Sequence, residues 1–204
     1  AFSLPTITAV TNPTVVCAGS GITLTANGGI SYTWAPIGST LNPATDNPTI
    51  STTYTVDGLD ANGCSGQGTV NILVNALPTL TLAATPATIC PGATSTLNAS
   101  GAINYTWAPI NSTVNPVAVT PSLTTTYTAS GEDANGCIGI DSIQVVVVPS
   151  PTVLISPLNA SVCAGSNVTL TATGATNYTW LPSNGTNSLT VETPTTTSTY
   201  TVIG

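Results

Sequence analysis

The chain repeats itself with a period of 73 residues. The segment YTWAPI at 32–37 returns at 105–110, and its variant YTWLP stands at 178–182. Cysteines and further tyrosines recur in the same register without an insertion or a deletion. A fixed period of this kind indicates a tandem array of one structural module. We therefore expect three copies, at residues 1–76, 77–149 and 150–204, the last of them incomplete.

Short runs of alternating apolar and polar residues, rich in Thr and Val and separated by Gly, Pro and Asn, predict β-strands throughout. No segment has a useful helical period. In the first copy we expect strands at 5–10, 22–26, around Tyr32 and Trp34, and at 49–51, 53–56 and 69–74. The stretch 38–47 is too irregular to assign, and the counterpart of 49–51 in the third copy is expected at 188–191. Seven short strands per copy indicate an all-β fold of tandem immunoglobulin-like β-sandwiches.

Aromatic residues mark the expected core of each copy. An indole buries more apolar surface than any other side chain here, so each Trp should lie at the centre of its module. The recurrent Tyr of the strand expected at 53–56 stands where immunoglobulin folds have a tyrosine corner. The expected core aromatic residues are Trp34, Trp107, Trp180, Tyr54, Tyr127 and Tyr200.

The connections between copies are short and contain Pro, at 75–78 and 149–151. Because Pro fixes φ, we expect the modules to form a stiff rod. The third copy ends at the position equivalent to Gly58 and lacks the last strand of the sandwich. An open sheet edge is expected there, to be completed by following residues or by another chain. The absence of Met indicates a window on a longer chain, with any export signal or anchor outside it.

Composition excludes several classes of function. Charged residues are 3% of the chain, Lys, Arg and His are absent, and the net charge is −7. Without cations the chain has nothing to neutralise phosphates, so nucleic acid is not expected as a partner. Without His, Lys or Arg it also lacks a side chain that titrates near neutrality and a cationic stabiliser of a transition state. We therefore expect no enzymatic activity, no catalytic residue and no cofactor.

Five cysteines in recurring positions, in a chain without His, predict disulfides and an oxidising compartment. One pairing joins cysteines within a copy, 17 with 64 and 90 with 137, and leaves Cys163 to pair with a cysteine beyond residue 204. The other joins Cys17 to Cys137 across copies. The reason to consider it equally is that the two cysteines of one sandwich should lie near opposite poles, ~25 Å apart, and Cα atoms beyond about 7 Å cannot be bridged. Both pairings stay open. The candidate disulfide residues are Cys17, Cys64, Cys90, Cys137 and Cys163.

Oxygen-bearing side chains crowd the loop before the last strand in the first two copies, which makes calcium a candidate ligand. Asp and Asn also occur in such turns for backbone reasons alone, and we favour that interpretation. The candidate calcium residues are Asp57, Asp60, Asn62, Glu132, Asp133 and Asn135.

Five motifs follow one another in the first copy, and the same motifs or variants of them recur in the second. In the first copy they read CAGS at 17–20, LTA at 24–26, YTW at 32–34, TTYTV at 52–56 and DANGC at 60–64. In this order they resemble the Ig-like and PKD-like tandem repeats of giant Bacteroidetes cell-surface adhesins, including gliding-motility adhesins of the SprB type exported by type IX secretion. The resemblance implies an extracellular, cell-surface filament and outer-membrane secretion or motility machinery as a partner. It implies a surface or polysaccharide as the ligand. The triplet Asp141-Ser142-Ile143 resembles the O-glycan acceptor of such proteins and makes Ser142 a glycosylation candidate.

Three functions remain as hypotheses. The first is a structural shaft segment of a long extracellular adhesin, whose partners are neighbouring repeats of the same chain. The second is a carbohydrate- or calcium-binding accessory module of a secreted protein. The third is a filament subunit completed by a strand from a neighbouring chain. Near-identity of the copies favours the first, because a specialised binding module is expected to vary its loops.

Overall fold

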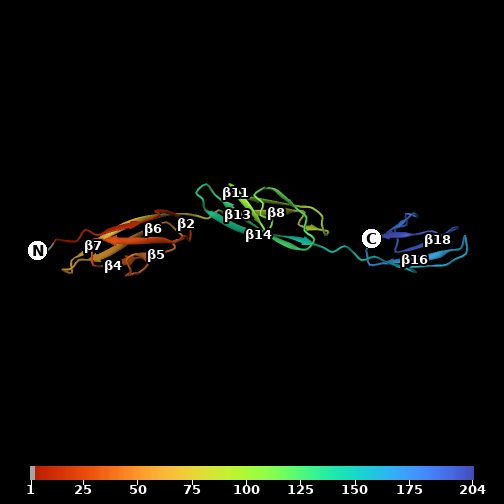
Figure 1. Cartoon of the computed structure of the whole chain (residues 1–204), viewed down its shortest axis with the longest axis horizontal. Coiled ribbons are helices and arrows are strands. Elements are labelled where there is room, and N and C mark those ends of the chain that lie inside the picture. Colours follow the sequence, from red (N-terminus) through yellow and green to blue (C-terminus); the bar gives the residue numbers. More distant parts are fainter. Residues whose placement is uncertain (1–2) are drawn as a thin grey trace.

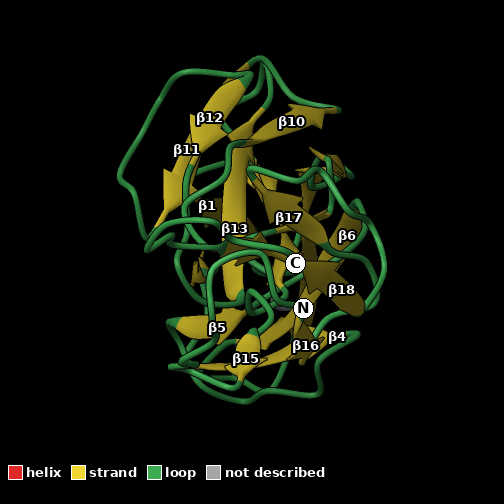
Figure 2. Cartoon of the chain, turned by 90° about the vertical axis from the view of Figure 1, so that its right-hand side faces the viewer, coloured by secondary structure: helices red, strands yellow, loops and turns green. Residues whose placement is uncertain are grey.

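The computed structural model describes residues 3–204 and contains three separate hydrophobic cores placed end to end (Figure 1). These cores define the first, second and third units, which span 7–74, 80–147 and 153–202. Residues 3–204 form strands and loops without a helix (Figure 2). The prediction of an all-β rod of immunoglobulin-like sandwiches is confirmed.

The first unit is a sandwich of two sheets. One sheet has the order β1-β3-β5, and the other has the order β2-β7-β6-β4. Side chains from both sheets meet in a core around the fully buried Trp34. The strands are β1 (Thr8–Thr11), β2 (Val15–Cys17), β3 (Ile22–Asn27), β4 (Ser31–Ala35), β5 (Ala44–Asp46), β6 (Thr52–Leu59) and β7 (Ser65–Asn75).

The alternation in β3 shows how the sequence builds this sandwich. Ile22, Leu24 and Ala26 point into the core and are buried, whereas Thr23 on the other face is exposed. Thr suits an exposed pleated surface because its β-branch fits the strand and its hydroxyl meets water. The two-residue period therefore fixes which face of the strand joins the core.

Two strand predictions for the first unit are wrong. The first strand begins at Thr8, three residues later than predicted. Residues 49–51 form a bend and a loop, and the strand that pairs with β3 lies earlier, at Ala44–Asp46. The side chain of Asn42 explains the shift, because it accepts from the N–H of Ala26 and donates to its carbonyl, both at 2.8 Å. This amide extends the β-ladder by one step, so the chain enters β5 directly after it.

The second unit repeats this arrangement. Its sheets have the orders β12-β10-β8 and β11-β13-β14-β9, and Trp107 is fully buried between them. In both units a short strand pairs in parallel with the last long strand, β2 with β7 and β9 with β14. The strands are β8 (Thr81–Thr85), β9 (Thr88–Ile89), β10 (Ser95–Ser100), β11 (Asn104–Ala108), β12 (Val117–Val119), β13 (Thr125–Glu132) and β14 (Ile138–Val147).

The third unit has the sheets β15-β16-β18 and β17-β19, and Trp180 is fully buried between them. Strand β19 corresponds to β6 and β13 of the first two units. There these strands pair with the long last strands β7 and β14, whereas within residues 3–204 β19 pairs only with β17. Tyr200 is accordingly half-buried. The strands are β15 (Leu154–Ser156), β16 (Val168–Thr173), β17 (Thr179–Leu181), β18 (Leu189–Glu192) and β19 (Thr201–Ile203).

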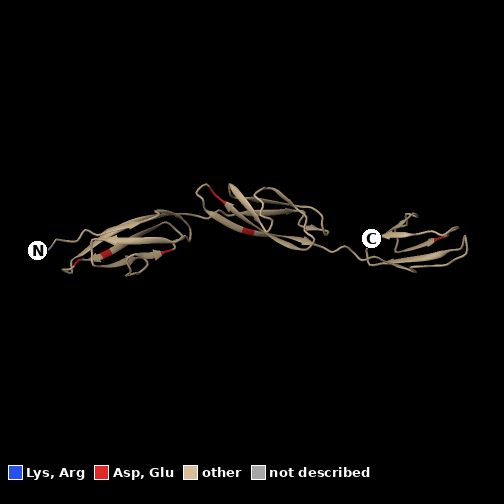
Figure 3. Cartoon of the chain, viewed as in Figure 1, with Lys and Arg blue, Asp and Glu red and all other residues tan. Residues whose placement is uncertain are grey.

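The few acidic residues are scattered along the rod, and no basic residue accompanies them (Figure 3). None of the described residues belongs to a helix long and apolar enough to cross a membrane.

Candidate functional site

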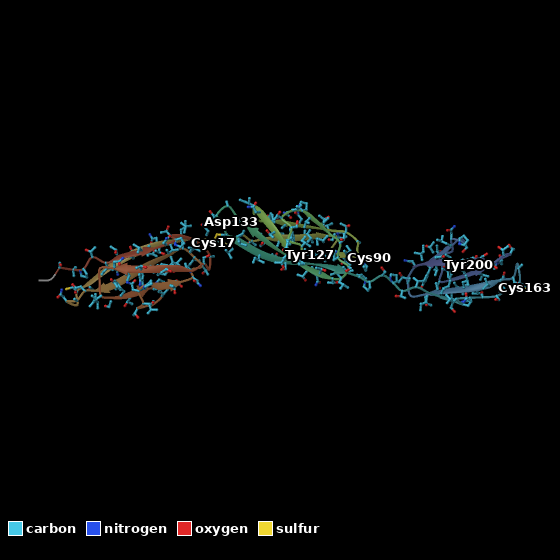
Figure 4. All side chains as sticks on the ribbon, viewed as in Figure 1. Cys17, Cys90, Tyr127, Asp133, Cys163 and Tyr200 are labelled. Carbon is cyan, nitrogen blue, oxygen red and sulfur yellow. A yellow bond between two sulfur atoms is a disulfide. The ribbon has the colours of Figure 1, made fainter. Side chains whose placement is uncertain are left out.

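The structure joins Cys17 to Cys137 by a disulfide, with a Cα–Cα distance of 5.5 Å and a sequence separation of 120 residues. The bond connects the end of β2 in the first unit to the loop between β13 and β14 in the second. Figure 4 shows Cys17 at the junction of the two units, beside Asp133 of that loop. Of the two pairings that the sequence left open, this is the one between copies.

Strand register explains why Cys17 does not pair with Cys64. Cys17 lies level with Asn75, the last residue of β7, because β2 and β7 are parallel. Cys64 directly precedes Ser65, the first residue of the same strand of 11 residues. At ~3.3 Å per residue the two cysteines are therefore roughly 35 Å apart. A disulfide needs Cα atoms within about 7 Å, so the local pair is geometrically excluded.

Backbone hydrogen bonds hold the turn that carries Cys17. The N–H of Ala18 donates to the carbonyl of Asn75 at 2.9 Å, and that of Gly19 donates to Pro48 at 2.9 Å. Gly19 has φ +80°, a conformation that Gly adopts without steric cost. The turn is thus fixed to two neighbouring segments, and the cysteine is presented at the pole of the first unit.

A carboxylate organises the opposing loop. One oxygen of Asp133 accepts from the backbone N–H of Asn135 at 2.8 Å and of Cys137 at 2.9 Å. The N–H of Asp133 donates to the carbonyl of Cys137 at 3.0 Å. Cys137 itself is fully buried. Asp133 therefore positions the cysteine, which is a backbone role of the kind we favoured for these loops.

The first unit has the same loop without a bonded partner. Asp60 accepts from the N–H of Asn62 and of Cys64, each at 2.8 Å. These donors, with that of Cys64 contributing most, lower the pKa of the Asp60 carboxyl. Cys64 is half-buried and carries a free thiol, as do the exposed Cys90 and Cys163.

The two remaining acidic calcium candidates, Asp57 and Glu132, belong to strands β6 and β13. Asp57 on β6 accepts from the side-chain amide of Gln67 at 2.9 Å. Glu132 is the last residue of β13, and its carboxylate lies near Gly136. No group of three His, Cys, Asp or Glu side chains within residues 3–204 is arranged to hold a metal ion.

Ser142, the glycosylation candidate, is exposed on β14. Its hydroxyl lies 2.9 Å from that of Thr128 on β13, and its N–H donates to the Asp141 carboxylate at 2.8 Å. The side chain is accessible at a strand surface and not in a loop.

Two sets of tyrosines have different roles. Tyr54 is fully buried and donates to the carboxylate of Asp46, and burial together with this bond raises its pKa. The tyrosine corner is expected at Tyr54, but its hydroxyl bonds a side chain, and the tyrosines that bond a nearby backbone belong to the second set. Tyr32 donates to the carbonyl of Gly29 at 2.7 Å and accepts from its N–H at 2.8 Å. Tyr105 and Tyr178 repeat this closure. Its sequence signal is a small residue three positions before each of these tyrosines.

The third unit has a hollow of about 710 Å³ on its open side. Its walls are mixed: apolar side chains such as Ile155, Val168 and Leu170 line one part, and polar residues of the segments 159–161 and 195–199 line the rest. In the second unit, β14 lies against the corresponding face and contributes the fully buried Val145. The hollow therefore lies at the place that β14 occupies in the second unit.

No family model and no curated protein matches the chain. Solved structures resemble it at low identity. Murine CEACAM1b is 13% identical, with a TM-score of 0.31, 70% of this chain covered and 100% of that one. A Ca²⁺-stabilised, ice-binding adhesin of an Antarctic bacterium is 13% identical, with a TM-score of 0.34 and coverages of 94% and 64%. A bacterial 1.5-MDa ice-binding adhesin is 14% identical, with a TM-score of 0.30 and coverages of 93% and 84%.

Proposed function

We propose that the chain is a load-bearing shaft segment of a long extracellular, cell-surface adhesin. The observation that carries the proposal is the disulfide between Cys17 and Cys137. It gives the first two units a second covalent connection besides the linker at 75–78. Two connections at one junction restrict bending and keep the units in line, which is what a shaft requires.

The disulfide also changes the path of a pulling force. Tension applied at the two ends of the chain passes along residues 1–17, across the sulfur atoms, and on from Cys137. Most strands of the first two units lie within the closed loop and outside this covalent path. Unfolding of these strands cannot lengthen the tether while the bond is intact.

Composition supports the same role. The chain has no Lys or Arg, so it presents no cleavage site to proteases of trypsin specificity. A disulfide is also typical of secreted proteins in oxidising surroundings. An extracellular position of the chain accounts for both features.

Single-molecule stretching of the full chain by its two ends tests the proposal. Reduction of the disulfide, or the substitution Cys17→Ser, should release additional extension of roughly 400 Å, because each freed residue adds ~3.3–3.6 Å. Cys64→Ser is the matched control and should stretch like the unmodified oxidised chain. Equal extension of the oxidised and reduced chains would refute the shielding role.

The finer form of the proposal follows the sequence resemblance. It is a gliding-motility adhesin of the SprB type, exported by type IX secretion, that attaches cells to a surface or polysaccharide. Antibodies against the chain should label intact, unpermeabilised source cells, and loss of the type IX machinery should abolish that labelling. Labelling only after permeabilisation would contradict it.

A second candidate function rests on the hollow of the third unit. In this role the chain is a filament subunit. A strand of a neighbouring copy fills the hollow beside β19 and, like β14, has Val or Ile at alternate positions. A synthetic peptide with the sequence 141–148 should bind the full chain and perturb Tyr200 and Trp180. A peptide with Ser in place of Ile143, Val145 and Val147 should not bind, because the face that packs on the core would then be polar. Equal binding of both peptides, or of neither, would contradict this role.

The calcium-binding alternative has no support from residues 3–204, where no three His, Cys, Asp or Glu side chains are grouped to hold a metal ion.

A further inference from the structure

We propose that Cys163 and Cys64 are the two complementary halves of a second junction, which joins one copy of this chain to another, head to tail, through a disulfide. The inference extends the shaft from one molecule to a series of molecules. It starts from a junction present in the structure, because the positions equivalent to Cys163 and Cys64 are Cys17 and Cys137, and these two are bonded.

The turn at Cys163 has the geometry of the bonded turn at Cys17. The N–H of Ser166 donates to the carbonyl of Cys163 at 2.9 Å, as that of Ser20 does to Cys17. The N–H of Gly165 donates to Pro194 at 2.9 Å, and its φ of +78° is close to the +80° of Gly19. The third unit thus presents an exposed thiol in the conformation that the first unit uses for bonding.

The loop at Cys64 has the geometry of the bonded loop at Cys137. In each loop one Asp carboxylate accepts from the N–H of the cysteine and from an Asn two residues before it, at 2.8–2.9 Å. In each loop the Asp N–H donates back to the cysteine carbonyl, at 2.9 Å for Asp60 and 3.0 Å for Asp133. The turn and the loop of the bonded junction therefore each have an equivalent elsewhere in the chain, and the cysteine of each equivalent is a free thiol.

Both equivalents lie at poles that no other unit of residues 3–204 covers. Cys163 is at the far tip of the third unit (Figure 4). Cys64 is at the end of β7 remote from the second unit, since the other end of β7 is level with Cys17. The turns at Cys17 and Cys163 are both uncharged, so in either junction the acidic residues of the loop face an uncharged turn. End-to-end contact of two copies therefore repeats a known contact without opposing like charges.

Cys90 provides an internal control. It sits in the same kind of turn, with the N–H of Ala93 donating to its carbonyl at 3.0 Å, and it is exposed. However, it lies at the pole of the second unit that faces the third (Figure 4). An incoming loop would have to enter between two linked units, so Cys90 should not take part in the joining of two copies.

The reaction is thiol–disulfide exchange with a small-molecule disulfide, such as oxidised glutathione, as the oxidant. The thiolate of Cys163 attacks glutathione disulfide, and one glutathione thiol leaves. The thiolate of Cys64 from another copy then attacks the Cys163 sulfur of the mixed disulfide and displaces the second glutathione. Two protein thiols become one disulfide, and the two electrons and two protons reduce glutathione disulfide to two thiols.

The test is oxidation of the full chain in a glutathione buffer over a range of protein concentrations. Non-reducing electrophoresis should show a ladder of oligomers that grows with concentration. Mass spectrometry of an unreduced chymotryptic digest should identify Cys64 bonded to Cys163. Cys90→Ser should give the same ladder, whereas Cys64→Ser and Cys163→Ser should each stay monomeric.

Mixing the two single variants in equal amounts gives the sharpest result. Each then offers one half of the junction, so dimers should form and nothing larger. Dimers of either variant alone, symmetric Cys64–Cys64 bonds, linkage through Cys90, or a wild-type chain that stays monomeric would each overturn the inference. The stretching experiment reads only the bond between Cys17 and Cys137, so the shaft proposal and this inference can fail separately.

Discussion

The second and third units have the same buried Trp but differ in how far the core is closed around it. In the second unit Ile89 lies on β9, pairs in parallel with β14 and is 6% exposed. Its equivalent in the third unit, Val162, belongs to no strand and is 43% exposed. Tyr127 is likewise buried, whereas its equivalent Tyr200 is only half-buried. One strand, β14, therefore accounts for the closure of the second unit.

The comparison also shows what does not depend on that strand. Trp180 is fully buried and Leu170 is nearly so, although no counterpart of β14 packs on the third unit within residues 3–204. Tyr178 donates to the carbonyl of Ala175 as its equivalents do. The centre of the sandwich thus forms from the strands around the Trp, and the last strand adds the outer part of the core.

The largest effect is expected from removal of the central indole. Trp107→Ala should destabilise the second unit by about 3–5 kcal/mol, because it leaves a large cavity in a closed core. Trp180→Ala should abolish the protection of the third unit altogether, since fewer buried side chains remain there. Hydrogen exchange resolved by segment measures both. Ile103→Ala, at an exposed position, is the control, and unchanged exchange of β13 in the Trp107 variant would contradict the expectation.

A matched pair of truncations tests the role of β14 directly. Ile89→Ala should cost about 2–5 kcal/mol, as buried Ile truncations do. Val162→Ala, at the equivalent position, should change the stability by less than about 0.5 kcal/mol, as exposed substitutions do. Urea unfolding followed by hydrogen exchange gives both values. Equal costs would mean that the third unit closes around Val162 in solution.

Removal of a tyrosine hydroxyl should cost more stability in a closed core than in the open core of the third unit. Tyr54→Phe should cost about 1.5–3 kcal/mol, because a hydrogen bond to the Asp46 carboxylate is lost. Tyr200→Phe should cost less than about 0.5 kcal/mol at its partly exposed position. Asp46→Val added to Tyr54→Phe should restore part of the loss, since the second unit already has Val119 at that position. Urea denaturation of the unmodified chain, the two single variants and the double variant measures these differences. A double variant with no more stability than Tyr54→Phe would contradict the expected recovery.

The smallest effect concerns alkaline pH. Burial raises the pKa of Tyr54 and of Tyr127 above the ordinary value of about 10. The unfolded chain therefore releases these protons at lower pH than the folded chain does. The resulting stability is fully present below about pH 10 and falls as the pH rises through the folded pKa. Denaturation curves between pH 8 and the alkaline range should show this decline, and Tyr127→Phe should reduce it in the second unit. An unchanged decline in that variant would show that other groups cause it.

Local pattern was enough to predict the all-β fold and the inward faces of the strands. The alternation of Ile22, Leu24 and Ala26 specifies the buried face of β3, because strand side chains alternate with a period of two. The position of β5 could not be predicted in the same way. It depends on the amide of Asn42 bonding to Ala26, a contact between residues 16 positions apart that leaves no local pattern.

The sequence by itself determined the repeat, the class of fold, the lack of cationic chemistry and the presence of cysteines at two recurring positions. Only the tertiary structure decided which cysteines meet. The choice follows from the parallel register of β2 and β7, which places Cys17 and Cys64 at opposite ends of one strand, and from the linker that brings the next unit to the first of these ends. A residue pattern specifies which side chains are buried, whereas distances between poles depend on strand length and on how units follow one another.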